Sequence, residues 1–313
     1  MKKKQWIVLL SLLLCSMTFS FTTIQAAKKQ NSKKDRITVI REQLFNPNSK
    51  KVLVASHRGD WRNYAENTIE GIEGAIAMGV DIVEMDLHKT KDGQIILMHD
   101  PTVNRTTTGK GNISDFTLEE IKNMKVKNGC AIRTKYKVPT LEEALLACKG
   151  KIMVNLDKAF DMFDDVYKIM EKTGTTNQII MKSEKSYEEV QRDFGKYLDK
   201  VIYMPIVRVH KKGGVEKVRE FEEKMHPVAF EILYEDDNDP SIQQVKEILK
   251  GKSQIWYNTL WKYMSGPHDD DQAMENPDSS YGYLINNGDG RIIQTDRPAY
   301  LINYLKKNKL YVK

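Results

Sequence analysis

Residues 56–100 read SHRGDWRNYAENTIEGIEGAIAMGVDIVEMDLHKTKDGQIILMHD. An apolar run at 52–56 precedes them and predicts a buried strand that ends beside His57. Residues 66–78 carry apolar side chains at helical spacing, and residues 81–87 form a second apolar run. The segment therefore predicts a strand, a helix and a second strand, with a chemically reactive side chain where the first strand ends.

The second predicted strand carries two acidic side chains. Glu84 and Asp86 are two residues apart, so on a strand they face the same way. Positions 82, 83 and 85 are apolar, which indicates that both faces of the strand are buried. Two carboxylates side by side in such surroundings favour a bound cation. Oxygen ligands suit a hard divalent cation, Ca²⁺ or Mg²⁺.

A hairpin is predicted to bring His99 to the same place. Asp92-Gly93 is the signature of a two-residue turn. That turn places Asp86 opposite His99, with their Cβ atoms about 4.5–5.5 Å apart. His57 lies at the end of the neighbouring predicted strand. Two histidines beside a metal can divide the roles of general base and general acid.

The sequence also contains an ordered set of short motifs: His57-Arg58-Gly59, Glu66-Asn67-Thr68, Glu84-x-Asp86, His99-Asp100, Arg105-Thr106-Thr107, Pro139–Glu143 and Thr295–Pro298. Together these motifs resemble the glycerophosphodiester phosphodiesterase family over roughly residues 50–310. The resemblance implies that His57 and His99 are the catalytic acid and base. It also implies that Glu84 and Asp86 bind a divalent metal together with a later acidic residue.

The later acidic residue departs from the pattern of the family. The family usually has Glu followed two residues later by Lys, whereas this chain has Asp157 followed by Lys158-Ala159. The resemblance therefore assigns Asp157 as the third metal ligand, and the expected lysine is missing. Lys182, at the end of the next predicted strand, is a candidate to replace it as a phosphate ligand. Arg58 suits bidentate binding of a phosphate.

The fold prediction is an α/β protein, a (β/α)₈ TIM barrel. Eight apolar segments alternate with mostly helical ones and predict strands at 52–56, 81–87, 152–157, 178–182, 201–206, 228–233, 254–259 and 291–294. A doubly wound sheet would require a glycine-rich phosphate loop after the first strand, and none is present. A hairpin and insertion follow the second strand, at 88–139, and a long loop at 260–290 separates the seventh and eighth strands. Both are expected over the C-terminal face of the barrel.

The N-terminal residues differ in composition from the rest. Residues 1–27 combine three lysines, an apolar run and small residues, which predicts a secretory signal peptide. Residues 28–49 are polar and lysine-rich and predict a linker before the barrel domain at 50–313. We therefore expect an exported protein, periplasmic or secreted. Lipid anchoring at Cys15 is not expected, because Leu14 stands where a small residue would precede a lipidated cysteine.

Composition limits the class of protein. The 313 residues are 40% hydrophobic and 29% charged, as in soluble globular domains. The net charge of +6 gives no basis for a nucleic-acid partner, and the N-terminal apolar run is too short to span a membrane stably. Cys130 and Cys148 could pair in an oxidising compartment or remain free thiols. The sequence does not indicate an oligomeric state.

The resemblance implies a metal-dependent phosphoric diester hydrolase that cleaves small glycerophosphodiesters to sn-glycerol 3-phosphate and an alcohol. Two alternatives remain open at this point. One is a phosphodiesterase of the same superfamily that acts like a lysophospholipase D or a phospholipase. The other is a barrel that binds phosphate without catalysis.

Overall fold

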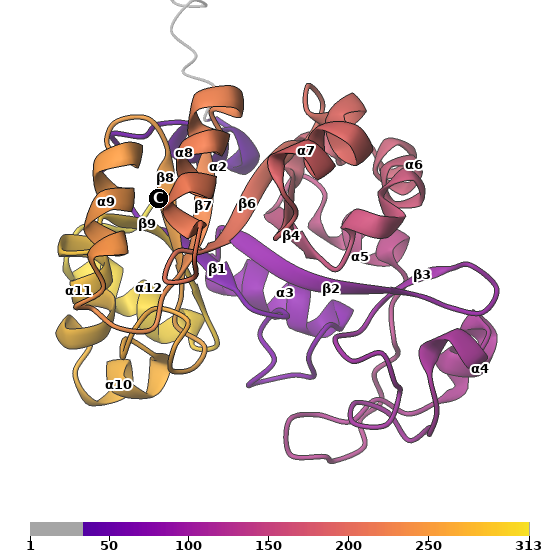
Figure 1. Cartoon of the computed structure of the whole chain (residues 1–313). Coiled ribbons are helices and arrows are strands. Elements are labelled where there is room, and N and C mark those ends of the chain that lie inside the picture. Colours follow the sequence, from indigo (N-terminus) through magenta and orange to yellow (C-terminus); the bar gives the residue numbers. More distant parts are fainter. Residues whose placement is uncertain (1–33, 313) are drawn as a thin grey trace, which may run out of the picture. The chain divides into compact units, whose positions relative to one another are not determined.

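The computed structural model describes residues 34–312 of the chain. Its centre is a barrel of parallel strands, in which β1 pairs with both β9 and β2 and so closes the ring (Figure 1). The eight strands are β1 (Leu53–Ser56), β2 (Ile82–Lys89), β4 (Met153–Asp157), β5 (Ile179–Ser183), β6 (Ile202–Arg208), β7 (Ala229–Leu233), β8 (Gln254–Asn258) and β9 (Gly290–Thr295). The predicted TIM barrel is confirmed. The predicted signal peptide and Cys15 lie outside the described residues.

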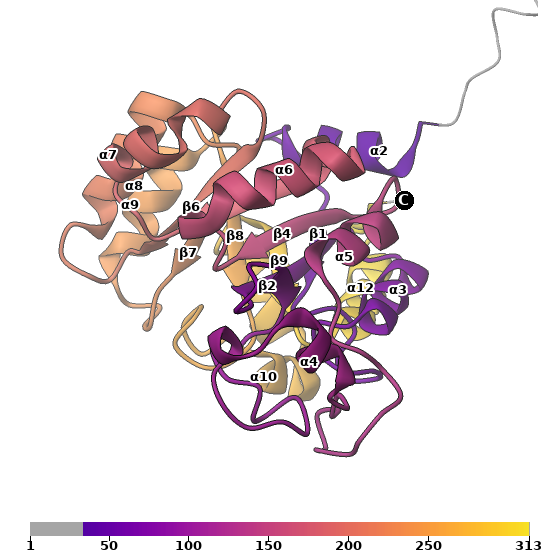
Figure 2. The same ribbon diagram turned by 90° about the vertical axis from the view of Figure 1, so that its right-hand side faces the viewer.

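Helices follow the strands and surround the barrel (Figures 1 and 2). They are α3 (Ile69–Met78), α5 (Leu141–Cys148), α6 (Phe163–Thr173), α7 (Tyr187–Glu189) with the turn Val190–Phe194, α8 (Gly214–Met225), α9 (Pro240–Leu249) and α12 (Pro298–Lys307). Capping side chains mark the starts of some of them. Thr68 caps α3 through Gly71, and Thr140 forms a capping box with Glu143 at α5. The helix predicted at 66–78 is confirmed, and helices also occur in the predicted helical segments between the later strands.

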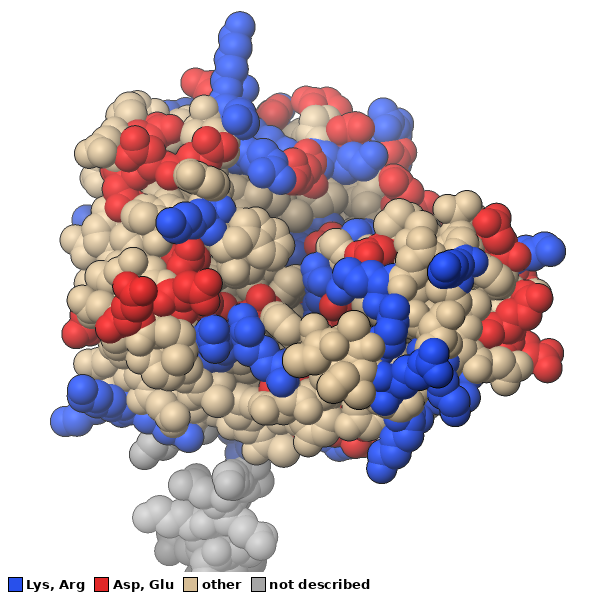
Figure 3. All heavy atoms as spheres, turned by 90° about the horizontal axis from the view of Figure 1, so that it is seen from below, with Lys and Arg blue, Asp and Glu red and all other residues tan. Residues whose placement is uncertain are grey.

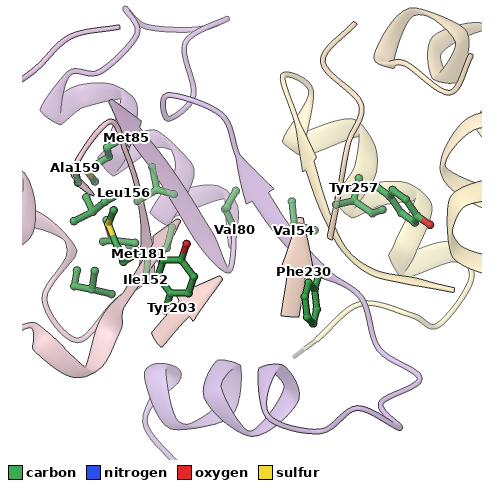
Figure 4. Close-up of a cluster of buried hydrophobic side chains, with 14 of the residues drawn as sticks. Val54, Val80, Met85, Ile152, Leu156, Ala159, Met181, Tyr203, Phe230 and Tyr257 are labelled. Carbon is green, nitrogen blue, oxygen red and sulfur yellow. The ribbon is translucent and has the colours of Figure 1, made fainter. Parts of the chain in front are cut away.

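Alternation along the strands divides the apolar side chains into two sets. The outward set packs against the helices, and Figure 4 shows three members, Met85, Leu156 and Met181, on the same side of neighbouring strands. The inward set fills the N-terminal half of the barrel and includes Ile82, Met153, Ile180, Ala229, Trp256 and Ile292. Residues two positions further along the strands therefore form the next inward layer. That layer is polar: Glu84, Asn155, Lys182, Glu231, Asn258 and Gln294.

The segment predicted to be a polar linker contains a helix, so that prediction is wrong for residues 36–44. Helix α2 (Arg36–Leu44) buries Ile37, Ile40 and Leu44 against the inward apolar set. These three residues follow the spacing i, i+3, i+7 and form an apolar stripe along the helix. The helix closes the N-terminal end of the barrel.

Both predicted insertions follow their strands as expected. The first contains strand β3 (Ile95–Leu97) and helix α4 (Leu118–Asn123), with a small core of its own that includes Ile96, Met98, Ile113 and Ile121. The second contains α10 (Asp270–Glu275) and α11 (Tyr283–Asn286). In the views of Figures 1 and 2, α4 and α10 lie at the same end of the barrel, opposite α2.

The predicted register of the hairpin is wrong by one residue. Leu87 pairs with Leu97, and the backbone N–H of Met98 donates to Asp86, so Met98 rather than His99 lies opposite Asp86. The loop has three residues and ends in Gly93 at φ +79°, the conformation that this loop length requires. His99 lies in the bend after β3, beyond the ladder.

Two further expectations concern the cysteines and the membrane. Cys130 is exposed, Cys148 is buried, and both are free, so they do not pair. Within residues 34–312, no helix has the length and apolar composition needed to cross a bilayer.

We predict that Ile40→Ala lowers the free energy of unfolding by about 2–5 kcal/mol, because it leaves a cavity where α2 closes the barrel. Denaturant-induced unfolding measures this change. Ile132→Ala is the matched control, since Ile132 is 62% exposed, and should stay within about 0.5 kcal/mol of the parent protein. Equal effects of the two substitutions would show that α2 does not contribute to the core.

Candidate active site

Three carboxylates meet at the C-terminal end of the barrel. β2 and β4 are neighbours, and their register pairs Asp86 with Asp157. Oxygen atoms of Glu84, Asp86 and Asp157 lie within 4.8 Å of one another, close enough to bind one cation. Glu84 and Asp86 are each 1% exposed. The structure therefore brings together the three residues that were predicted to bind a metal.

Asp86 accepts hydrogen bonds from two side chains and forms an ion pair with a third, Arg58. Asn67 Nδ2 donates to Asp86 Oδ2 at 2.9 Å, and Arg58 Nε lies 3.4 Å from the same oxygen. Lys158 Nζ lies 2.5 Å from Asp86 Oδ1. All three partner residues have left-handed backbone, with φ of +54° at Asn67, +55° at Arg58 and +58° at Lys158. Backbone strain of this kind persists where the surroundings compensate for it, commonly at functional sites.

The pKa values of Glu84 and Asp86 are shifted in opposite directions. Burial, and then the charge of Asp86, raises the pKa of Glu84 well above its ordinary value. Burial acts in the same direction on Asp86, but the charges of Lys158, Arg58 and His99 outweigh it and hold the Asp86 pKa far below its ordinary value. The protein's own cations therefore favour the charged form of Asp86 but do not offset the burial of Glu84. Additional positive charge is what a divalent cation would bring, so the donor set fits one.

His57 is buried and oriented by a carboxylate. It is 7% exposed, and its Nδ1 donates to Asp296 Oδ1 at 2.7 Å. The same oxygen accepts from Trp61 Nε1 at 2.6 Å, and the ring of Trp261 lies edge-on to the imidazole at 6.2 Å. Burial lowers the pKa of His57 below 6.5, although Asp296 acts against this change. The neutral ring therefore has its unprotonated nitrogen, Nε2, on the side away from Asp296.

Asp296 is fixed by a second buried aspartate. Asp270 accepts from the backbone N–H of Asp296 at 2.7 Å and from the hydroxyls of Thr259, Thr295 and Tyr281. Burial raises the pKa of Asp270 to about 6, against the effect of these hydrogen bonds. The loop after β8 thus anchors the residue that orients His57.

His99 belongs to a different chain of contacts. Its Nδ1 donates to Asp100 at 2.8 Å, and Arg105 bridges Asp100 to Glu66. Glu66 in turn accepts from Arg58 at 3.1 Å. The side chain of His99 is 37% exposed, so it lies nearer to solvent than His57. His99 does not lie opposite Asp86 as predicted, but it is close enough for its charge to lower the pKa of Asp86.

Lys182 lies inside the barrel, between two carboxylates. Its side chain is 3% exposed, and Nζ lies 3.4 Å from both Asp157 and Glu231. Burial alone would lower its pKa, but these carboxylates and Glu84 raise it above the ordinary value. The lysine is therefore charged and stabilises the acidic cluster. Its predicted contact with phosphate stays a prediction.

Several site residues were not predicted from the sequence. Asp296 belonged only to the Thr295–Pro298 motif, with no predicted catalytic role, and no role was predicted for Glu231. The signal for Glu231 was a charged residue inside an otherwise apolar strand. Glu66 was quoted only as part of a motif. The sequence does not indicate a role for Lys158, because the direction of its side chain depends on the sign of its own φ angle.

Figure 3 shows the face that carries the two insertions, where basic and acidic side chains meet near the middle. Fold and site together define a TIM-barrel protein with a carboxylate cluster and two carboxylate-bound histidines at the C-terminal mouth. The sequence model of the glycerophosphoryl diester phosphodiesterase family matches residues 57–218, just over half of the chain. The chain therefore belongs to this family. A model described as a domain of unknown function matches residues 203–305.

Individual relatives agree with this assignment. The glycerophosphodiester phosphodiesterase of Caldanaerobacter subterraneus is 43% identical over 111 residues, which cover 34% of this chain and 45% of that protein. The Bacillus subtilis enzyme of the same name is 36% identical over 156 residues, 46% of this chain and 48% of that protein. The chain thus spans about half the length of the curated relatives that it matches.

Solved structures show the same fold at low sequence identity. A glycerophosphoryl diester phosphodiesterase from Parabacteroides distasonis has a TM-score of 0.71 at 20% identity, with 88% of this chain and 93% of that chain covered. An Oleispira antarctica phosphodiesterase in complex with the product sn-glycerol-3-phosphate has a TM-score of 0.61 at 18% identity, covering 82% of this chain and 97% of that chain.

We predict that His57 titrates below pH 6.5 in protein kept free of divalent metal, because burial disfavours its charged form. Asp296→Asn should lower the His57 pKa further, since it removes the carboxylate that favours the imidazolium. Histidine ring chemical shifts followed by NMR against pH measure both changes. Asp278→Asn, which removes an exposed carboxylate, should leave the titration unchanged. A rise of the His57 pKa in Asp296→Asn would contradict the proposed contact.

Proposed function

We propose that the protein is a metal-dependent glycerophosphodiester phosphodiesterase, which hydrolyses its substrate to sn-glycerol 3-phosphate and an alcohol. The observation that carries the proposal is the position of Glu84, Asp86 and Asp157 at the barrel mouth, beside two histidines that are each bound to a carboxylate. Family membership and the names of the curated relatives support the reaction class. The substrate is a small molecule.

The three carboxylates would hold Ca²⁺ or Mg²⁺. Their oxygen donors suit either hard cation. When bound, the cation would neutralise phosphate oxygens and lower the pKa of a water or a substrate hydroxyl. Lys182 and Arg58 keep Asp157 and Asp86 oriented toward the site. Arg58 is also our candidate for binding the phosphate, because a guanidinium can bind two phosphate oxygens at once.

The two histidines divide the proton transfers. We assign His57 as the general base, because its Nδ1 donates to Asp296 and the neutral ring offers the lone pair of Nε2. His99 then acts as the general acid and protonates the leaving alkoxide. Its greater exposure suits this role, since the alcohol product leaves toward solvent.

We also propose that the protein is exported. The predicted signal peptide at 1–27 supports a periplasmic or secreted protein, in which the substrate would be met outside the cytoplasm.

We predict that the purified protein releases sn-glycerol 3-phosphate from glycerophosphocholine, and that chelation stops this release until Ca²⁺ or Mg²⁺ is restored. His57→Ala and His99→Ala should each lower kcat by about 10²–10⁴-fold, because each removes a proton-transfer group. A coupled assay for glycerol 3-phosphate measures the turnover. His226→Ala is the matched control, because His226 has a 74% exposed side chain at the end of α8.

Three results would contradict this function. Full turnover after exhaustive chelation would exclude the metal dependence. Release from a lysophospholipid without release from glycerophosphocholine would instead favour the lysophospholipase D alternative, and turnover of neither substrate would favour the non-catalytic barrel.

We predict that Asp157→Asn raises the Kd for divalent metal by at least about tenfold, because it replaces an anionic ligand with a neutral one of the same size. Asp157→Glu should bind metal more nearly like the parent protein, since it keeps the charge. Calorimetric titration with Ca²⁺ and Mg²⁺ compares the two variants. Parent-like affinity in Asp157→Asn would mean that Asp157 is not a ligand.

A further inference from the structure

Three protein cations contact the carboxylate cluster, and they differ in how firmly they are held. Lys182 pairs with both Asp157 and Glu231, and Arg58 pairs with both Glu66 and Asp86. Within residues 34–312, Lys158 pairs with Asp86 alone. The side chains of Lys182 and Arg58 are 3% and 12% exposed, whereas that of Lys158 is 33% exposed. Lys158 is therefore the cation that can leave the cluster at the least cost.

The backbone explains how Lys158 reaches the cluster. Asp157 ends β4 with its carboxylate at the mouth of the barrel. In a regular strand the next residue would point to the opposite face. Lys158 instead has φ +58°, and its N–H donates to Asp157 Oδ1 at 2.7 Å. This left-handed residue turns the ammonium group back onto Asp86, on the oxygen not used by Asn67.

The ammonium group of Lys158 lies where a divalent metal would bind Asp86. Asp86 Oδ1 is one of the few oxygens of the cluster that a metal could use, since Oδ2 already accepts from Asn67. An ammonium at 2.5 Å from Oδ1 occupies the space that a metal would need there. Coulomb repulsion between the ammonium and a divalent ion at such a separation is strong in a partly buried site. The ammonium group and a metal would therefore compete for Asp86 Oδ1.

We propose that Lys158 is an internal counter-ion of the metal site, and that a divalent cation binds by displacing its ammonium group from Asp86 toward solvent. This inference rests on the proposed metal site and adds an exchange step to it. Lys158 stabilises the metal-free protein by neutralising Asp86. For the same reason it weakens metal binding, because the metal must replace an existing ion pair.

Calorimetric titration of the metal-free protein with Ca²⁺ and Mg²⁺ tests the exchange without any substrate. Lys158→Met removes the competing charge and keeps a side chain of similar length, so its Kd should fall about tenfold or more. Lys158→Arg keeps the charge and should bind metal no more tightly than the parent protein. Lys168→Met, which removes a lysine with a 73% exposed side chain, is the control and should leave the Kd unchanged.

Thermal unfolding provides a second readout. Lys158→Met should lower the Tm in chelator, because Asp86 loses one of its two ion pairs, and metal should raise the Tm more than it does in the parent protein. A merely structural lysine would lower the Tm equally with and without metal, and that result would overturn the inference.

Lysine labelling tests the displacement itself. Reductive methylation followed by mass spectrometry should modify Lys158 faster in metal-saturated protein than in chelator, while the rate at Lys168 stays constant. An unchanged or slower rate at Lys158, or equal Kd values in parent and Lys158→Met, would overturn the exchange while leaving the metal site intact. Absence of metal binding in the parent protein and in Lys158→Met would overturn the metal site itself, and the exchange with it.

Discussion

A buried carboxylate, Asp86, sets the constraint on which the rest of the site depends. At 1% exposure it would be costly to ionise without partners, since an uncompensated buried charge costs several kcal/mol. Its three partners, Asn67, Arg58 and Lys158, come from loops after β1 and β4, and each has a left-handed backbone that costs roughly 1–3 kcal/mol. The fold sustains this strain because these partners compensate the charge of Asp86. Through these contacts, Asp86 on β2 fixes the loops that follow β1 and β4.

Much of the fold could be predicted because alternation of apolar segments is a local property of the sequence. The eight strands lie close to their predicted bounds, and helices occur between them as expected. Helix α2 was not predicted, because the polar, lysine-rich composition of its segment hides the helical spacing of Ile37, Ile40 and Leu44. The hairpin register was missed because a two-residue and a three-residue loop fit the same letters. Here Asp92 accepts from Thr90 and from the backbone of Leu118, contacts that only the folded chain contains.

The site could be predicted in part for a related reason. Glu84, Asp86 and Asp157 lie on neighbouring strands, so strand register alone brings them together. The partners of the histidines depend on loops, whose conformation the sequence does not encode locally. Lys158 shows the limit most clearly. The missing lysine at position 159 suggested that a charge had been lost, yet a positive φ at position 158 returns a lysine to the cluster.

The two matched segments of the chain are parts of one barrel rather than separate domains. The family match ends at residue 218, but β7, β8 and β9 lie beyond it, and the barrel closes only when β9 pairs with β1. The segment matched by a domain of unknown function, 203–305, contains Glu231 and Asp296. Glu231 pairs with the charge of Lys182 and holds it inside the barrel, and Asp296 orients the ring of His57. The segment without an assigned function therefore supplies two carboxylates that act on residues within the family match. Neither half could form this site alone, because each contributes one side of the same ion pairs and hydrogen bonds.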